Sequence, residues 1–273
     1  MLREMTKQEL AFFDSEQFQE YAVTYNMVYQ HLDVIERVLT DEEKKIMILF
    51  ATGKSMLIWS DKHLDEQKKK QYMSHVLELM VKEGKEVKGI FASKDDLPIF
   101  FGLYQEGQDV AYEREEMLSY SCSNLILPKR SGRLIKADKT YIATVANFIE
   151  QFEKESFGSQ SDPKKCLERS RNLIQIGQAY LWQHDGHITA MGLLSGQSKH
   201  VGRINYIYVD KAFRRKGYAQ MLVASLCEIL QKQNRLPVLY AMKENDYSNK
   251  AYKNIGFEMG GQLYSAFVQQ VTK

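Results

Sequence analysis

Strand-like runs and amphipathic helical patterns alternate along most of this chain, and that alternation limits the folds available to it. In the first half, strands and helices are expected in turn at residues 55–60, 64–84, 86–93, 95–107 and 115–122. After residue 132 the alternation starts again and continues nearly to the C-terminus. Alternating strands and helices pack as sheets covered by helices. The sequence therefore predicts an α/β (α+β) protein.

The chain is long enough for two ordinary domains, and a turn-rich segment near its middle is the best boundary. That segment is PKRSG, at residues 128–132. We predict a helical and α/β N-terminal domain at residues 1–130 and a second domain at residues 131–273. At the start of the first domain, apolar residues at spacings of three and four indicate helices through about residue 55.

Capping and turn residues mark the elements of the second half. Asp138 is expected to cap a helix that runs through Glu155, and Pro163 to be the first residue of another helix. Asp185 and Gly186 form one of the strongest short signals for a hairpin turn. The second half thus repeats the layered pattern of the first.

Composition limits the partners and the location of the protein. The 37 basic and 35 acidic residues give a net charge of +2, which provides no overall attraction to nucleic acid. No apolar run is long enough to span a bilayer, and the N-terminal residues lack the apolar segment of a signal peptide. Cys122, Cys166 and Cys227 are far apart and odd in number, which is typical of reduced thiols. We expect a cytoplasmic protein without nucleic-acid or membrane partners.

Positive charge and a glycine gather where a long helical pattern begins, in AFRRKGYAQM at residues 212–221. The first amides of a helix have no partner within it, and the helix dipole adds partial positive charge there. Gly217 would let an anion approach the backbone, and Ala219 would keep the next turn thin. Three cations directly before Gly217 add full charges. The segment therefore predicts a site for a pyrophosphate group.

The spacing Arg-x-x-Gly-x-Ala in this segment resembles the acyl-CoA-binding motif of the GNAT superfamily, the acyl-CoA-dependent N-acyltransferases. Further along, NDYSNKAYKNIGF resembles the second signature of the superfamily, and the matching residues are Asn245, Ser248, Tyr252, Gly256 and Phe257. The resemblance covers about half of the chain and implies a GNAT-fold mixed sheet flanked by helices. It also implies transfer of an acetyl group from acetyl-CoA to a primary amine of a small-molecule or peptide acceptor, without a metal.

The resemblance implies roles for individual residues. The strand before the loop would splay from its neighbour and hold the thioester through backbone groups, and Tyr252 would be the catalytic acid that protonates the CoA sulfur. The cofactor-binding residues implied in this way are Ile207, Tyr208, Val209, Arg214, Arg215, Lys216, Gly217, Tyr218, Ala219, Gln220, Asn245 and Ser248. The general base is not assigned, because this strand carries no carboxylate. Glu244, or a water relayed by the backbone or by Asn205, are alternatives.

The first half follows a strand–helix order similar to the second, but its equivalent of the phosphate loop is missing. DKHLD, at residues 61–65, contains no glycine and two aspartates that would repel phosphate. A degenerate GNAT-like domain that binds no CoA and a helical cap of unrelated fold are both consistent with this pattern. In either case this half would shape the acceptor pocket or support association, and a homodimer is compatible with the sequence.

Other interpretations of the chain are an acyl-CoA sensor, a nucleotide-binding protein and a metal-binding protein. A GNAT-like protein that binds acyl-CoA as a sensor, without catalysis, is the main alternative to an enzyme. The segment ATGKS resembles the end of a nucleotide-binding loop, but Ile48 stands where that loop needs a glycine. His184 and His187 straddle a tight turn, so we expect no metal site there.

Overall fold

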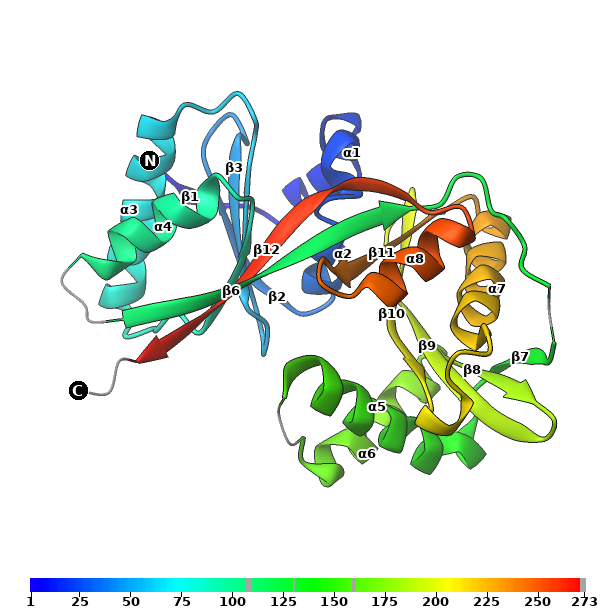
Figure 1. Cartoon of the computed structure of the whole chain (residues 1–273). Helices are drawn as coiled ribbons and strands as arrows, with labels where there is room; N and C mark the ends of the chain where they lie inside the picture. Colours follow the sequence, from blue (N-terminus) through cyan, green and yellow to red (C-terminus); the bar gives the residue numbers. More distant parts are fainter. Residues whose placement is uncertain (107–109, 130, 159–160, 271–273) are drawn as a thin grey trace. The chain divides into compact units, whose positions relative to one another are not determined.

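The computed structural model describes residues 1–273 except 107–109, 130, 159–160 and 271–273, and the chain divides into two compact units. The first unit consists of Met1–Tyr120, Tyr240–Asn245 and Met259–Lys273, and the second of Ser121–Leu239 and Asp246–Glu258. Figure 1 labels most of their helices and strands. The predicted division into residues 1–130 and 131–273 remains a prediction, and Arg130 itself lies outside the described residues.

A mixed sheet forms the centre of the first unit. Its strand order is β1 (Arg3–Glu4), β2 (Ile35–Thr40), β3 (Ile46–Ala51), β4 (Met56–Ser60), β5 (Gly89–Ala92), β12 (Glu258–Gln270) and β6 (Val110–Ser121). Each of the strands β1 to β4 pairs antiparallel with the next one along the chain. Strands β4 and β5 pair in parallel, and β12 pairs antiparallel with β5. A helix between β4 and β5 makes the parallel pairing possible.

Helices cover both faces of this sheet. Helices α3 (Glu66–Lys82) and α4 (Asp96–Gln105) share one apolar core with alternate residues of β4, Met56 and Ile58. Trp59 points to the opposite face, where its ring contacts those of Phe12 and Phe18. That face is covered by η1 (Glu9–Asp14), α1 (Glu16–Ala22) and α2 (Met27–Leu32). The alternation follows from the two-residue period of a strand.

The prediction of helices through residue 55 is wrong beyond α2, because residues 35–40 and 46–51 form strands β2 and β3. Every residue of β3 is buried, so its sequence IMILFA is one continuous apolar run. Such a run shows no two-residue alternation, and apolar periodicity alone does not separate it from a buried helix.

The second unit contains most of the elements expected in the second half of the chain, whereas the last of them, β12, belongs to the first unit except for Glu258. Its strand order is β11 (Leu236–Met242), β10 (Val201–Val209), β9 (His187–Gln197), β8 (Ala179–His184) and β7 (Arg133–Lys136). Strands β10 and β11 pair in parallel and the other neighbours pair antiparallel. This sheet and its helices confirm the α/β fold with a mixed sheet flanked by helices.

The sheet of the second unit lies between two helical layers (Figure 1). Helices α5 (Ile142–Phe157) and α6 (Pro163–Gln175) share a core with Met191 and Leu193 of β9. A Cβ atom on Gly192 would point at Leu222 and Leu226 of α7 (Tyr218–Lys232), so α7 covers the other face. The short helix α8 (Asp246–Asn254) contacts α7.

Several capping and turn predictions are confirmed at the atomic level. Pro163 is the first residue of α6, and Asp185 and Gly186 form the β8–β9 turn with φ angles of 46° and 78°. Asp138 caps a different element from the one expected. Its carboxylate accepts from the amide of Thr140 in the 3-10 turn η2 (Lys139–Tyr141), and α5 begins only after that turn.

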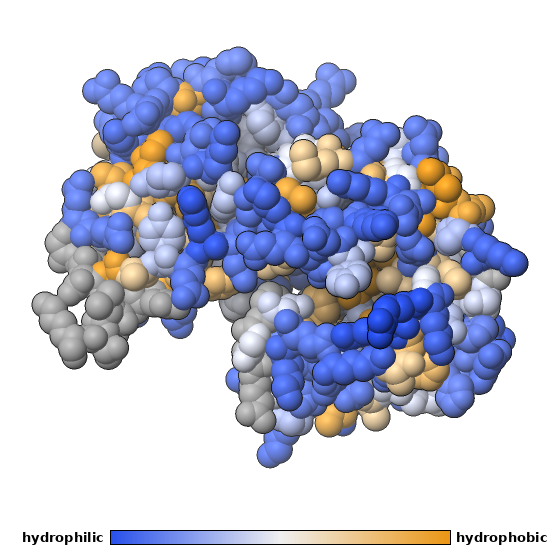
Figure 2. Space-filling model, in the orientation of Figure 1, coloured by the Kyte–Doolittle hydropathy of each residue, from blue (hydrophilic) through white to orange (hydrophobic). Residues whose placement is uncertain are grey.

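Hydrophilic residues predominate on the face shown in Figure 2, and the hydrophobic residues on it form separate small groups. Within the described ranges, no helix combines the length and the apolar character needed to cross a membrane.

Candidate functional site

Strand β10 carries a bulge just before its C-terminal end. Asn205 lies opposite Leu193 of β9, but the next partners along the strand are Tyr208 and Met191. Tyr206 and Ile207 together therefore face the single residue between those partners, which is the two-against-one count of a β-bulge. The parallel pairing with β11 covers only residues 201–203 of β10. Three expected backbone contacts of a thioester, Ile207, Tyr208 and Val209, thus lie beyond that pairing.

The loop after β10 leads to an open helix start. Gly217 has a φ of 80° and occupies the capping position of α7, where no side chain caps the helix. The first hydrogen bond of the helix runs from the amide of Met221 to the carbonyl of Gly217. The preceding amides, those of Tyr218, Ala219 and Gln220, have no partner within the helix. This arrangement is suited to an anion.

The three cations of the loop have different surroundings. Arg214 donates through Nη2 to both carboxylate oxygens of Glu155 on α5, at 3.0 and 2.7 Å, and through Nε to the carbonyl of Val209. Arg215 and Lys216 are exposed, and the Nζ of Lys216 lies 5.7 Å from the ring centroid of Phe213. Arg214 thus fastens the loop to α5, whereas the other two side chains face solvent.

Tyr218 and Gln220 make contacts that fix the start of α7. The Tyr218 side chain is buried, and its ring lies 5.3 Å from that of His184. Its backbone amide, rather than its phenol, is therefore the group available to a ligand. The Nε2 of Gln220 donates to the carbonyl of Ala251 on α8 at 3.2 Å. A pocket of about 300 Å³ opens between these helices, lined by Gln220, Asp246, Tyr247, Lys250, Ala251 and Asn254.

Helix α8 brings two of the expected residues together. Tyr252 is buried, with an exposed fraction of 6%, and a hydrogen bond joins its phenol to the Ser248 side chain one turn earlier. Burial raises the pKa of Tyr252 to about 12, and the Ser248 hydrogen bond opposes part of that rise. Tyr252 therefore keeps its proton at neutral pH, as a proton donor must.

The remaining expected residues lie in a segment of the first unit or at the bulge. Asn245 and Glu244 are exposed and belong to the segment Tyr240–Asn245 of the first unit. The Oδ1 atom of Asn205 is buried and has no hydrogen-bond partner in the described part of the chain. Neither Glu244 nor Asn205 is assigned as the general base.

Sequence reasoning missed the acidic end of α5. Glu153 and Glu155 on its last turns pair with Arg169 and Arg214, at 2.5 and 2.7 Å. Glu153 also accepts a hydrogen bond from Tyr206 at the bulge. In the sequence these glutamates look like an ordinary solvated helix face, and only the tertiary fold brings them to β10 and its loop.

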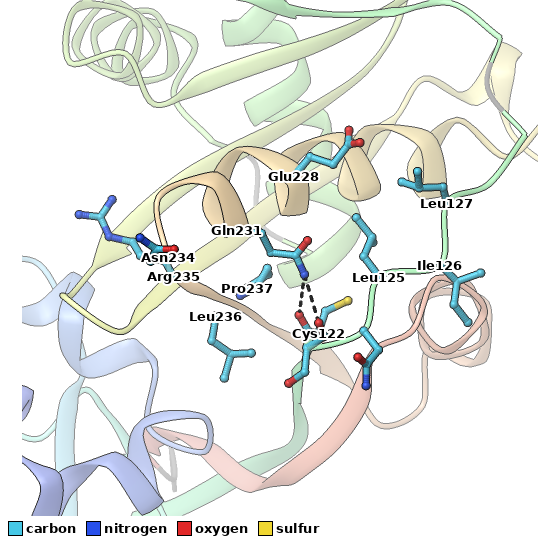
Figure 3. A pocket seen from close by; sticks show the side chains of 12 residues that line it. Cys122, Leu125, Ile126, Leu127, Glu228, Gln231, Asn234, Arg235, Leu236 and Pro237 are labelled. Carbon is cyan, nitrogen blue, oxygen red and sulfur yellow. Dashed lines mark hydrogen bonds between the residues drawn. The ribbon is translucent and has the colours of Figure 1, made fainter.

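A larger pocket, of about 770 Å³, lies at the C-terminal end of α7 (Figure 3). Residues 122–127 form one wall, and Gln231 on α7 donates to the carbonyls of Cys122 and Ser123 at 3.3 and 3.4 Å. None of the expected site residues lines it. The C-terminal end of a helix carries partial negative charge, which disfavours phosphate. The start of α7 is therefore the better candidate, although its pocket is smaller.

The first unit follows the same element order but closes the equivalent place. Strand β4, helix α3, parallel strand β5 and helix α4 correspond to β10, α7, β11 and α8. The Asp65 carboxylate accepts from the amide of Lys68 and so caps α3 with negative charge. Behind this cap, Lys69 donates at 2.8 Å to the fully buried Asp96, which also accepts from Ser60. The start of α3 is thus capped by a carboxylate and lies beside an internal ion pair, whereas the start of α7 is open.

The candidate site lies within a segment that is similar to a known protein family. A family model described as acetyltransferase (GNAT) family matches residues 142–257, which include the loop before α7 and all of α8. None of the curated proteins matches the chain.

Solved structures of similar fold cover both units. A GNAT-family acetyltransferase from Colwellia psychrerythraea is 12% identical with a TM-score of 0.59, covering 99% of this chain and 100% of its own. A GCN5-related N-acetyltransferase from Sphaerobacter thermophilus is 12% identical with a TM-score of 0.63, covering 100% and 96%. A Drosophila protein, also 12% identical, has a TM-score of 0.70 and covers 100% and 99%. At this identity they show the fold alone. The family match at residues 142–257 is the finding that supports a C-terminal half of the GNAT superfamily.

Proposed function

We propose that this protein is an N-acetyltransferase that moves the acetyl group of acetyl-CoA to a primary amine of a small molecule or peptide. One observation carries the proposal. The bulged strand β10 is followed, after the loop at residues 210–216, by an uncapped helix start at Gly217, within the segment that matches the GNAT family. This arrangement supports a thioester site next to a pyrophosphate site.

The start of α7 would hold the pyrophosphate of CoA. The amides of Tyr218, Ala219 and Gln220 would donate to its oxygens, and the helix dipole would add to the attraction. Arg215 and Lys216 would contribute charge from solvent-exposed positions. Arg214 would contribute less, because Glu155 already compensates its charge. Its main role would be to hold the loop against α5.

The acyl end of the cofactor would lie along β10 and α8. Backbone groups of Ile207, Tyr208 and Val209 would contact the pantetheine arm and polarise the thioester carbonyl. Asn245 and Ser248 would border the arm near the thioester. These contacts would add to the binding provided by the charged loop. They would also hold the carbonyl carbon in a fixed position.

The transfer itself needs one bond made and one broken. The neutral amine nitrogen would attack the carbonyl carbon, giving a tetrahedral intermediate whose oxygen the β10 amides stabilise. The carbon–sulfur bond would then break, and Tyr252 would give its phenolic proton to the departing sulfur. The proton lost by the amine would go to solvent or to a base that we do not assign, and Tyr252 would regain its proton from water.

The test is a pair of measurements on the full chain. Calorimetry should show binding of acetyl-CoA, and a panel of amines with acetyl-CoA should show release of free thiol for at least one amine. Binding without thiol release for any amine in a broad panel would favour the alternative, an acyl-CoA sensor. Absence of acetyl-CoA binding would refute both.

A further inference from the structure

The bulge of β10 depends on a residue in an unfavourable backbone conformation. Tyr206 has a φ of 50°, in the left-handed region that residues with a Cβ atom seldom occupy. Such a conformation persists only where the surrounding structure compensates its cost. The question is which contacts hold Tyr206, because the backbone groups proposed to bind the thioester begin at the next residue.

Contacts from two helices hold the Tyr206 side chain. The Phe152 ring of α5 lies 4.5 Å from the Tyr206 ring, centroid to centroid, and the Arg169 guanidinium of α6 lies 4.3 Å from the same ring. The Tyr206 hydroxyl donates to Oε1 of Glu153 at 3.0 Å. We call these four residues the ring clamp: Phe152, Glu153, Arg169 and Tyr206.

Glu153 is itself fixed by other donors. Arg169 donates to its Oε1 at 2.5 Å, and the hydroxyl of Ser161 donates to its Oε2. The carboxylate thus serves three donors of this chain. Burial raises the pKa of Tyr206 to about 12, so the phenol retains the proton that it donates to Glu153 at neutral pH. These features are those of a rigid anchor.

We propose that Tyr206 is a positioning residue, and that the ring clamp holds the β10 bulge in the geometry that lets the following backbone amides polarise the thioester carbonyl. The proposal rests on the binding of acetyl-CoA proposed above. It predicts that Tyr206 acts through the orientation of the backbone at residues 207–209. Tyr206 neither touches the leaving sulfur nor takes the proton of the amine.

The test uses the carbonyl vibration of bound acetyl-CoA and needs no acceptor. Infrared difference spectra with acetyl-CoA carrying ¹³C at the thioester carbonyl should show a shift to lower frequency on binding, because polarisation weakens the carbonyl bond. Tyr206→Phe keeps the ring but loses the hydrogen bond to Glu153. It should lose at least half of that shift, with a Kd for free CoA within about twofold of the parent.

Two further variants separate the clamp from general effects. Tyr206→Gly adopts the same φ without strain, so it should fold and bind CoA but also lose most of the shift. Tyr180→Phe is the matched control, since Tyr180 is a partly buried tyrosine on β8 whose pKa is likewise raised by burial. It should keep the full shift.

The outcomes distinguish the two proposals. A full carbonyl shift in both Tyr206 variants, with the parent also showing it, would overturn the role of the clamp and leave the proposed function intact. If the parent itself binds no acetyl-CoA, the proposed function fails, and the clamp role fails with it.

Glu153→Gln tests a rival proton relay through Tyr206 and Glu153. Its amide oxygen can still accept from Tyr206, so a retained shift together with retained thiol release supports the clamp. A retained shift with thiol release abolished across the amine panel would instead show that the carboxylate carries a proton, and would overturn the positioning assignment.

Discussion

At the scale of single residues, Tyr252 is the most direct test of the chemistry. Tyr252→Phe keeps the buried ring and removes the proton, so folding and the KM for acetyl-CoA should change little. A positioned acid contributes about 10²–10⁴ in rate, and we expect kcat to fall within that range. Steady-state kinetics with a responsive amine measure this, and Tyr120→Phe, a buried tyrosine of the first unit, serves as control. A kcat within about twofold of the parent, with chemistry limiting, would exclude Tyr252.

The raised pKa of Tyr252 also has a consequence for stability. An unfolded tyrosine titrates near 10, whereas Tyr252 in the folded protein titrates at about 12. Between these values the unfolded state binds fewer protons, so the contribution of Tyr252 to the unfolding free energy is complete below pH 10 and is lost as pH rises toward 12. The loss amounts to up to about 1.4 kcal/mol per pH unit. Urea unfolding at pH 9, 10 and 11 should show a steeper decline for the parent than for Tyr252→Phe, and parallel curves would contradict the burial effect.

The sequence was sufficient to place some candidate site residues on their helices but not to name their contacts. The positions of Gly217 and Tyr252 could be predicted because a short motif places each at a fixed offset from a helix start, and the structure has Gly217 at the start of α7 and Tyr252 on α8. The pairing of Arg214 with Glu155 could not be predicted, because these residues lie 59 positions apart and no local pattern joins them. For the same reason the contact between Tyr206 and Glu153 was invisible in the sequence.

At the scale of elements, the start of α7 can be tested with a matched pair of glycines. Gly217 and Gly186 have φ angles of 80° and 78°, so a glutamate at either position suffers similar backbone strain. Only Gly217→Glu would also place a carboxylate at the proposed pyrophosphate site. We expect it to weaken CoA binding more than about tenfold, or about 1.4 kcal/mol, while Gly186→Glu keeps the affinity of the parent. Calorimetry on the folded variants decides, and unchanged affinity in Gly217→Glu would exclude this loop.

Elements were predictable where capping or turn residues mark them. Helix α6 begins at Pro163 as expected, because Asp162 and Pro163 form an unambiguous start. Strands β2 and β3 were missed because their burial depends on helices on both sides of the sheet, and that information is not local. Helix α5 was found, but its contacts with Tyr206 of β10 could be recognised only from the packed structure.

At the scale of the whole molecule, the two units should differ in cofactor binding although they share an element order. The first unit presents an aspartate-capped helix start and a buried Lys69–Asp96 ion pair where the second presents an open one. We therefore expect one CoA per chain. Calorimetry or native mass spectrometry measures the stoichiometry, and Gly217→Glu should weaken binding at this single site by the factor given above. Two CoA per chain, or one CoA whose affinity is unchanged in Gly217→Glu, would refute this assignment.

The division of the chain has a consequence for its synthesis. The first unit includes Met259–Lys273, and β12 from this region pairs with β5, which is made some 170 residues earlier. The N-terminal sheet therefore cannot be completed while the ribosome is still making the second unit. Until β12 emerges, β5 presents an unpaired edge, which is the kind of surface that promotes aggregation. The first unit can therefore finish folding only after the whole second unit has been synthesised, although most of the first unit is made earlier.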